Sequence, residues 1–339
     1  MRVFKNILVT GGSGFIGANF IKTLFKNSYQ TNIQRIINLD ALTYAGNRDN
    51  NQSYEDNDKY IFIEGDISSR RLVDEILKKY KVDLIINFAA ESHVDNSISG
   101  PKKFIETNVN GTLNLLMSFH NFAKQHSFKE RAFLQVSTDE VFGSLNFDDE
   151  KFTEQSPYKP NSPYSASKAS SDHLVRAWSE TFNLQTFITN CSNNYGPMQN
   201  DEKLIPKVIL SALSGKKIPI YGNGKNIRDW LFVDDHCEGI IKVFSEAPFG
   251  STYNIGGLSE KNNIEVVQHI CKILDELHPS KSSYSNLISF VKDRPGHDLR
   301  YAINPSKIMQ DTGWKPRESF ESGLKKTILW YLEKFLTNG

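Results

Sequence analysis

The stretch NILVTGGSGFIG, residues 6–17, decides the fold of this chain. An apolar run leads into glycines at positions 11, 14 and 17, and a helical pattern follows. Without a Cβ, glycine lets the backbone turn tightly and approach a diphosphate, which the free N–H groups at the helix N-terminus can bind. Gly11, Gly14 and Gly17 therefore predict a nucleotide-binding turn between a strand and a helix. A tight turn with a purely structural purpose is the alternative.

Beyond this stretch, apolar runs alternate with amphipathic segments through the first half of the chain. Strands that are buried on both faces read as continuous apolar runs, and parallel strands need helical crossovers. The alternation predicts an α/β fold with a Rossmann-type, doubly wound parallel sheet. The further strands are expected at residues 36–39, 60–63, 84–86, 133–137 and 185–191, and the helices at residues 17–27, 72–80, 105–116 (with a stripe of Ile105, Val109, Leu113 and Leu116) and 163–181.

The pattern changes after about residue 193, where elements become shorter and glycine and proline more frequent. This punctuation predicts a second, smaller mixed α/β lobe that binds the substrate. The expected division places residues 1–192 in the nucleotide-binding domain, with 228–250 returning to it, residues 193–227 and 251–318 in the substrate lobe, and residues 319–339 in a C-terminal helix.

Composition excludes several classes of protein. Lysine and arginine number 40 against 39 aspartates and glutamates, whereas a protein that binds nucleic acid is normally basic. The three cysteines are odd in number and widely spaced, which favours free thiols in a reduced, cytoplasmic setting and no metal site. We expect no signal peptide, because the N-terminus opens directly on a strand, and no membrane span.

Acidic and small residues at the next strand ends indicate NAD as the cofactor. Asp40 follows Gly17 by 23 residues, where a carboxylate can accept hydrogen bonds from ribose hydroxyls and repel the 2′-phosphate of NADP. A loop-capping role is its alternative. Asp66 could bond the adenine or cap a helix. Ala89 and Ala90 leave room for the cofactor, or simply pack tightly.

Reactive side chains follow the strand at residues 133–137. Thr138, Asp139 and Glu140 stand at its end, and two close carboxyl groups tend to hold one proton between them because like charges oppose joint ionisation. Tyr164 and Lys168 are four residues apart, so they share one helix face. A lysine and a nicotinamide cation would lower the phenol pKa from about 10 and make Tyr164 a usable base. Each motif alone could be structural. The acid pair could form a solvated turn, Thr138 could be a β-branched strand residue, and the Tyr–Lys spacing could occur by chance in a helix.

With these motifs the chain resembles the extended short-chain dehydrogenase/reductase superfamily. Within it, six strings resemble the dTDP-glucose 4,6-dehydratase family over nearly the whole chain. They are AAESHVD at 89–95, STDEV at 137–141, PYSASK at 163–168, CSNNYGP at 191–197, RDW at 228–230 and DRPGHD at 293–298. The discriminating string is Thr138-Asp139-Glu140, because the superfamily's epimerases lack the acid pair and have no elimination to catalyse.

The resemblance implies a reaction in three steps with a tightly bound NAD that each turnover regenerates. Tyr164 would take the sugar O4 proton while C4 gives its hydride to NAD, and Thr138 would position O4. Glu140 would remove the C5 proton and Asp139 would protonate the departing 6-hydroxyl. The hydride would then return to C6 and give a 4-keto-6-deoxy sugar.

The resemblance also implies the remaining contacts and a homodimer joined by the helix after Pro101 and the one that carries Tyr164. Arg228 and Arg294 could each fork onto a phosphate, although a surface ion pair is the alternative for either. The implied substrate residues are Ser92, Thr138, Asn193, Lys203, Leu204, Pro219, Tyr221, Arg228, Asn263, Arg294 and His297. The implied cofactor residues are Gly11, Gly14, Phe15, Ile16, Gly17, Asp40, Asp66, Ile67, Ala89, Ala90, Thr107, Tyr164, Lys168 and Asn194. The chain departs from the family pattern at Asn96 and Asn190, where arginine is usual.

The function expected from the sequence is therefore NAD-dependent dehydration of dTDP-glucose. UDP- or CDP-glucose remains an alternative substrate, because nothing in the sequence reads the base. A nucleotide-sugar 4-epimerase or a simple dehydrogenase would leave Asp139 and Glu140 idle. A non-catalytic NAD-binding scaffold on the same fold is the alternative from another class. The intact Thr138, Tyr164 and Lys168 count against such a scaffold.

Overall fold

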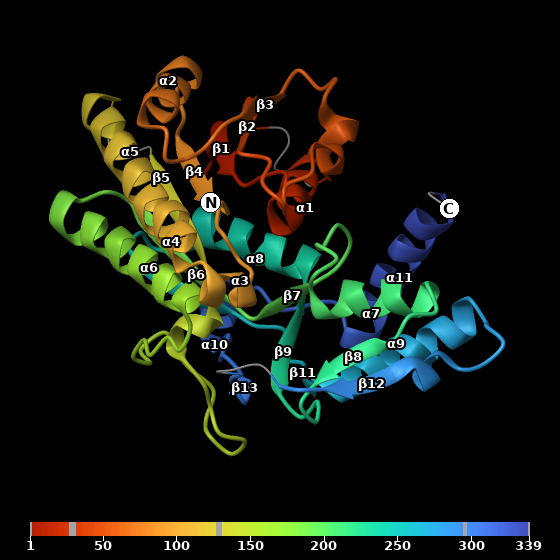
Figure 1. The fold of residues 1–339 in the computed structure, drawn as a ribbon. Helices are drawn as coiled ribbons and strands as arrows, with labels where there is room; N and C mark the ends of the chain where they lie inside the picture. The colour runs from red at the N-terminus through yellow and green to blue at the C-terminus, as the bar shows by residue number, and fades with distance from the viewer. Residues whose placement is uncertain (1, 27–31, 127–130, 294–296, 338–339) are drawn as a thin grey trace.

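A seven-stranded parallel sheet forms the centre of the molecule in the computed structural model, which describes residues 2–26, 32–126, 131–293 and 297–337 (Figure 1). The strand order is β10-β6-β5-β4-β1-β2-β3, and every neighbouring pair is parallel. The predicted α/β class is confirmed. The strands are β1 (Asn6–Thr10), β2 (Arg35–Asp40), β3 (Tyr60–Glu64), β4 (Leu84–Asn87), β5 (Ala132–Thr138), β6 (Thr186–Cys191) and β10 (Ser251–Ile255).

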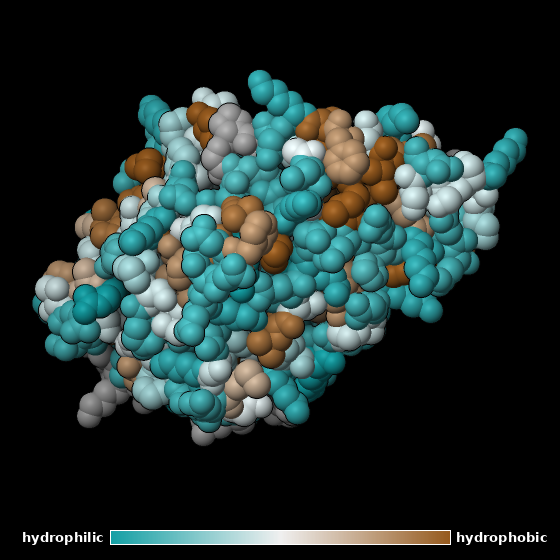
Figure 2. Space-filling view, turned by 90° about the horizontal axis from the view of Figure 1, so that it is seen from below, coloured by the Kyte–Doolittle hydropathy of each residue, from teal (hydrophilic) through white to brown (hydrophobic). Residues whose placement is uncertain are grey.

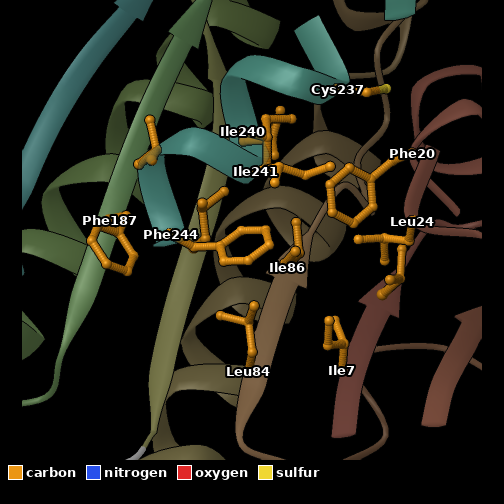
Figure 3. Close-up of a cluster of buried hydrophobic side chains, with 14 of the residues drawn as sticks. Ile7, Phe20, Leu24, Leu84, Ile86, Phe187, Cys237, Ile240, Ile241 and Phe244 are labelled. Carbon is orange, nitrogen blue, oxygen red and sulfur yellow. The ribbon is translucent and has the colours of Figure 1, made fainter. Parts of the chain in front are cut away.

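Helices cover both faces of this sheet. On one face lie α1 (Phe15–Lys26) and α8 (Val233–Glu246), and Figure 3 shows Phe20 of α1 and Phe244 of α8 above the side chains of β1 and β4. On the other face lie α2 (Arg70–Tyr80), α5 (Thr112–His126) and α6 (Pro163–Phe182). Alternate residues of one strand enter the two cores, as Val9 and Leu8 do. The continuous apolar strands of the sequence are explained by this burial on both faces.

The chain reverses its direction of sheet growth between β1 and β4. From β1 it adds β2 and β3 on one side, then crosses back to place β4, β5 and β6 on the other. In an open α/β sheet, ligands bind in the crevice that this reversal leaves at the carboxyl ends of the strands. Strands β1, β4 and β5 end at Thr10, Asn87 and Thr138, so a ligand is expected to bind at the loops that follow these residues.

A smaller lobe has its own core and two small sheets. Strand β9 (Ile227–Phe232) pairs with β7 (Asn193–Tyr195), β11 (Glu260–Asn262) and β13 (Arg300–Tyr301), while β8 (Ile218–Tyr221) pairs with β12 (Ile288–Val291). The helices α7 (Leu204–Leu213), α9 (Asn263–Leu277) and α11 (Phe320–Thr337) supply most of its buried side chains. In Figure 1 these helices gather beside the central sheet.

Three details correct the expected division of the chain. Residues 251–255 were expected in the smaller lobe but form β10, an edge strand of the main sheet, with Tyr253 and Ile255 fully buried. Strand β9 was expected to return to the main sheet; it pairs in the smaller sheet instead, although Leu231 packs in the core of the main sheet together with α8. The short helix α10 (Ser306–Thr312) also lies in the core of the main sheet, through Ile308.

The segment between Pro101 and His126 is not one regular helix. It comprises α4 (Pro101–Phe104), a π-helical turn η3 (Ile105–Gly111) and α5. The π turn rotates the following residues relative to an α-helix, so the predicted apolar stripe fails at its start, and Ile105 is 46% exposed. The predicted end of the first helix at residue 27 lies outside the described residues.

The surface is largely hydrophilic in the view from below, with hydrophobic residues in small groups and one larger group at the upper right (Figure 2). All three cysteines are buried and free. Among the residues that the structure describes, no helix has the length and apolarity to cross a membrane, and no cluster of side chains suits a metal ion.

Candidate active site

One cavity of about 330 Å³ lies at the carboxyl ends of β1, β2, β4 and β5, where the topology of the sheet predicts a ligand site. Its wall runs from the glycine turn at Gly11 to the pair Tyr164 and Lys168. The nucleotide-binding motif and the proton-transfer motif were read from separate parts of the sequence, and the fold brings them to a single space.

The glycine turn is shaped by close backbone contacts. Gly11 has φ of +69°, a conformation that side chains rarely adopt, and a Cβ there would lie 2.7 Å from the Ala89 nitrogen. A Cβ on Gly17 would lie 2.3 Å from the Gly11 carbonyl oxygen. The backbone of β1, the turn and the loop after β4 can therefore meet only without side chains at these glycines.

Asp40 and Asp66 both line the cavity, at the ends of β2 and β3. The carboxylate of Asp40 accepts hydrogen bonds from the backbone N–H groups of Ser13, at 2.8 Å, and Leu42, at 2.8 Å. Burial raises its pKa, and these two bonds lower it in part. Asp40 thus ties the glycine turn to its own loop, and each oxygen keeps a lone pair for a further donor. Asp66 accepts from Ser68 N at 2.7 Å, while Ser69 is the N-cap of α2.

The two carboxyl groups after β5 differ sharply in their surroundings. A 3-10 turn, η5 (Asp139–Phe142), follows β5, and the Thr138 hydroxyl caps it by accepting from Glu140 N at 3.3 Å. Asp139 is 2% exposed, whereas Glu140 is partly exposed. Burial, followed by the charges of Glu140 and Asp229, raises the pKa of Asp139 well above its usual range, although Arg228 opposes this. These surroundings favour the protonated form of Asp139, and its Oδ2 has no hydrogen-bond partner among the described residues.

Tyr164 and Lys168 lie on the face of α6 that packs on β5. Lys168 Nζ donates to the carbonyl oxygen of Val136 at 2.7 Å, and burial lowers the pKa of this ammonium. Burial and the charge of Glu140 raise the pKa of Tyr164 well above its usual value, while a hydrogen bond with Thr138 lowers it. The tyrosine is therefore a phenol in the protein alone, and it needs added positive charge beside it to act as a base.

Comparison with known proteins identifies the family of this chain. A family model described as GDP-mannose 4,6 dehydratase matches residues 8–327. The dTDP-glucose 4,6-dehydratase of Neisseria gonorrhoeae is 50% identical over 336 residues, which cover 97% of this chain and 96% of that protein. The chain belongs to the dTDP-glucose 4,6-dehydratase family.

Two solved structures of the dTDP-glucose 4,6-dehydratase family share the fold. The Bacillus anthracis enzyme in complex with NAD is 46% identical, with a TM-score of 0.85 and 97% of each chain covered. The Streptomyces venezuelae enzyme with NAD and TYD bound is 43% identical, with a TM-score of 0.88 and 97% of each chain covered.

The cavity gathers most of the residues that the family resemblance assigned. It is lined by all of the cofactor and catalytic residues and, of the substrate residues, by Ser92, Thr138, Asn193 and Lys203. Leu204, Pro219, Tyr221, Arg228, Asn263 and His297 do not line it, and Arg294 lies outside the described residues. A larger share of the residues expected to bind the cofactor than of those expected to bind the substrate therefore lines this cavity.

Part of the substrate set forms a second group in the smaller lobe. The rings of Tyr221 and His297 meet edge to face, with centroids 6.5 Å apart, and His297 Nδ1 lies 2.6 Å from Asp293 Oδ1. Arg228 is buried, and its guanidinium donates to the carbonyl oxygens of Ile227 and Asp298 and lies 4.3 Å from the centre of the Tyr301 ring. In this structure Arg228 is thus tied to its own lobe, while its charge reaches Asp139.

Other cavity residues were missed by sequence reasoning. Most lie at or soon after a predicted strand end, so proximity in sequence could have found them. Gln199, Asn200 and Glu202 come from a loop that carries no motif, and Lys103 comes from α4. The missed lining residues are Leu39, Ala41, Thr43, Ala45, Gly46, Gly65, Phe88, Glu91, Lys103, Val136, Ser137, Cys191, Ser192, Gln199, Asn200 and Glu202.

The two departures from the family pattern differ in position. Asn190 is fully buried behind the site, and its Nδ2 donates to the Thr138 carbonyl oxygen at 3.2 Å and to the Tyr158 hydroxyl at 3.4 Å. Asn96 is exposed on α3 (Val94–Ser99), where its backbone N–H donates to His93 Nδ1 at 3.2 Å. Only Asn190 therefore touches the site.

We expect Gly17→Ala to destabilise the protein by about 1–3 kcal/mol, the usual cost of overpacking, and to abolish retention of NAD. The new methyl group would overlap backbone atoms of Gly11 and Gly12, which cannot rotate away as a side chain does. Urea unfolding and the nicotinamide released on denaturation measure both effects. Gly100→Ala is the control, because a Cβ there comes no closer than 3.7 Å to Asn96 O. Wild-type stability and cofactor content in Gly17→Ala would contradict this account of the turn.

Proposed function

We propose that this protein converts dTDP-glucose to dTDP-4-keto-6-deoxyglucose and water with a tightly bound NAD. The observation that carries the proposal is the presence in one cavity of a glycine turn, a Tyr–Lys pair and two unlike carboxyl groups. Relatives near 50% identity over the whole chain are dTDP-glucose 4,6-dehydratases, and NAD is bound in solved structures of the family.

The residues that would hold NAD follow one another along the cavity, each group facing one part of the cofactor. The turn at Gly11–Gly17 and the N-terminus of α1 would take the diphosphate, and Asp40 the adenosine ribose. The nicotinamide would then lie towards Tyr164 and Lys168. When bound, NAD accepts and returns the hydride, and its cation adds the positive charge that Tyr164 lacks in the protein alone.

The first task of the protein residues is to take a proton from the sugar O4 hydroxyl. Tyr164 would accept it, with Thr138 holding O4 by a hydrogen bond. Lys168 stands one helical turn beyond Tyr164, so its ammonium would favour the phenolate form. Oxidation at C4 acidifies the C5 hydrogen, which prepares the sugar for elimination.

The second task divides between the two carboxyl groups. Asp139, whose pKa burial and neighbouring carboxylates raise, suits the acid that protonates the departing 6-hydroxyl. Glu140 is more exposed and suits the ionised base that removes the C5 proton. Loss of water would leave a double bond between C5 and C6; C6 would then receive the hydride and C5 a proton from Glu140, so NAD is regenerated and no net oxidation occurs.

The direct test is incubation of the purified protein with dTDP-glucose in D₂O. We expect a 4-keto-6-deoxy product, detected by its absorbance in alkali, with solvent deuterium at C5. UDP-glucose and CDP-glucose in parallel reactions establish which base is accepted. No product from any nucleotide-glucose would exclude the enzyme, and a 4-epimer formed without water loss would exclude the dehydratase.

We also propose a homodimer, in the cytoplasm, whose contact includes the helices between Val94 and Phe182. Large apolar side chains on these helices face solvent in the single chain: Ile98, Ile105, Met117 and Phe182 are each at least 36% exposed. The buried free cysteines suit a reducing compartment. Sedimentation of the wild type and of Ile98→Glu would test the dimer, which the charge should weaken.

A further inference from the structure

A buried carboxyl group that the reaction does not use lies one helical turn beyond Lys168 on α6. Asp172 follows Lys168 by one helical turn on α6, as Lys168 follows Tyr164, so the three side chains share one face. All three are buried, at 9%, 4% and 2% exposed for Tyr164, Lys168 and Asp172. A buried ionisable group is normally paired with another group or has a role in the function of the site.

The three residues contact consecutive positions of β5, the strand that also carries Thr138. Tyr164 shares a hydrogen bond with Thr138, Lys168 Nζ donates to Val136 O, and the Ser137 hydroxyl donates to Asp172 Oδ2 at 2.6 Å. The helix face and the strand are therefore joined at each of these positions, and Asp172, unlike Tyr164 and Lys168, does not line the cavity.

Groups from the other packed segments complete the surroundings of Asp172. From the loop before α6, the Tyr158 hydroxyl donates to Asp172 Oδ2 at 3.2 Å, and its ring meets that of His173 at 5.3 Å. From β6, Asn190 hydrogen-bonds Tyr158 and also Asp172. Ser137, Tyr158 and Asn190 carry no charge at neutral pH, so Lys168 is the cation that faces this carboxylate.

We propose that Asp172 is a positioning residue for the proton transfer at Tyr164: tied to Ser137 and Tyr158, its carboxylate keeps the buried Lys168 in its ammonium form. The inference rests on the proposed function, because it concerns how that reaction obtains its base. Lys168 needs such a partner, because burial otherwise favours the neutral amine, and a neutral amine does not help to ionise Tyr164.

The direction of each charge effect agrees with this role. Burial raises the pKa of Asp172 to about 6, and Lys168 with the hydrogen-bond donors opposes that rise. Burial lowers the pKa of Lys168, and Asp172 raises it again. Cys191, which also faces Lys168, has a pKa raised by burial to about 12 and is a neutral thiol at neutral pH. Above about pH 6 the charge beside Lys168 is therefore that of Asp172.

The test is the pH dependence of the first step, followed as NADH formed in a single turnover with dTDP-glucose. Asp172→Asn keeps the shape of the side chain and removes its charge, so the ammonium of Lys168 should lose its proton at lower pH. We expect the alkaline limb of the profile to move down by about 1–3 pH units, the usual effect of one close opposite charge. The NAD content and the KM for dTDP-glucose should stay at their wild-type values. If the asparagine variant does not fold, Asp172→Ser, which also removes the charge, is used in its place.

Two further variants separate charge from packing. Ser137→Ala removes the 2.6 Å hydrogen bond but leaves the carboxylate ionised in alkali, so its alkaline limb should match that of the wild type. Thr189→Val alters a buried hydroxyl on β6 that has no hydrogen-bond partner among the described residues, and it should leave the whole profile unchanged.

The two proposals fail in different ways. A wild-type limb in Asp172→Asn, even with a lower rate, would overturn the positioning role and leave Asp172 as a packing residue. A shift of equal size in Ser137→Ala would overturn it as well, because the charge would then not be the cause. A wild type that forms neither NADH nor product with any nucleotide-glucose would overturn the proposed function and this inference together.

Discussion

Glu140→Gln should form NADH normally and then stop. The substitution keeps the shape of the side chain and removes the base that would take the C5 proton, while Tyr164, Lys168 and the cofactor turn are untouched. Loss of a general base costs roughly 10²- to 10⁴-fold in rate, so overall turnover should fall by that factor. The near-ultraviolet absorbance of NADH should rise on addition of dTDP-glucose and persist, instead of passing through a small transient.

Deuterium at C5 makes the assignment sharper. Glu140→Gln should block exchange of the C5 hydrogen with D₂O, whereas Asp139→Asn should allow exchange and slow only the loss of water, because Glu140 remains as base. Glu75→Gln is the control, since Glu75 lies on the surface of α2 in an ion pair with Arg71 and does not line the cavity. Normal turnover in Glu140→Gln, or unchanged C5 exchange, would show that another group is the base.

The cofactor half of the site could be predicted because its requirements are local. Gly11 and Gly17 are needed where the backbone itself leaves no room for a Cβ, and that need is visible in twelve consecutive residues. The roles of Asp139 and Glu140 as acid and base, in contrast, are not decided by local sequence alone. The residues themselves indicated only that two adjacent carboxyl groups would hold one proton between them, and the family resemblance gave the acid role to Asp139. In the structure, burial and the charges of Glu140 and Asp229 favour the protonated form of Asp139, against the opposing charge of Arg228.

Non-local pairing limited the prediction of the fold. Leu231 and its neighbours read as a core strand, and Leu231 does pack in the core of the main sheet, yet the strand pairs with β7, β11 and β13. The polar start of Ser251–Ile255 concealed an edge strand of the main sheet. The π turn at Ile105–Gly111 interrupts the 3.6-residue period of hydrophobic positions by which an α-helix is predicted.

The same limit explains why Asp172 was missed. Its partners come from β5, the loop at residue 158 and β6, so no window of sequence contains the group. The spacing of Tyr164, Lys168 and Asp172 is regular, but helical spacing alone does not distinguish a buried carboxyl group from a surface one. Burial, which the structure supplies, makes that distinction.

Tyr164→Phe should abolish the first step and, unlike Glu140→Gln, leave no NADH. Removing the hydroxyl removes the acceptor for the O4 proton, so hydride transfer from C4 should slow by roughly 10²- to 10⁴-fold. The ring should keep its packing against Phe104, with centroids 6.3 Å apart, so NAD should still be retained. Single-turnover absorbance and the nicotinamide released on denaturation measure the two quantities in one preparation. Tyr195→Phe is the matched control, because that hydroxyl donates to Phe320 O at 3.3 Å within the core of the smaller lobe. NADH formed at the wild-type rate in Tyr164→Phe would assign the base to another group and remove the reason for a lysine and a carboxylate behind it.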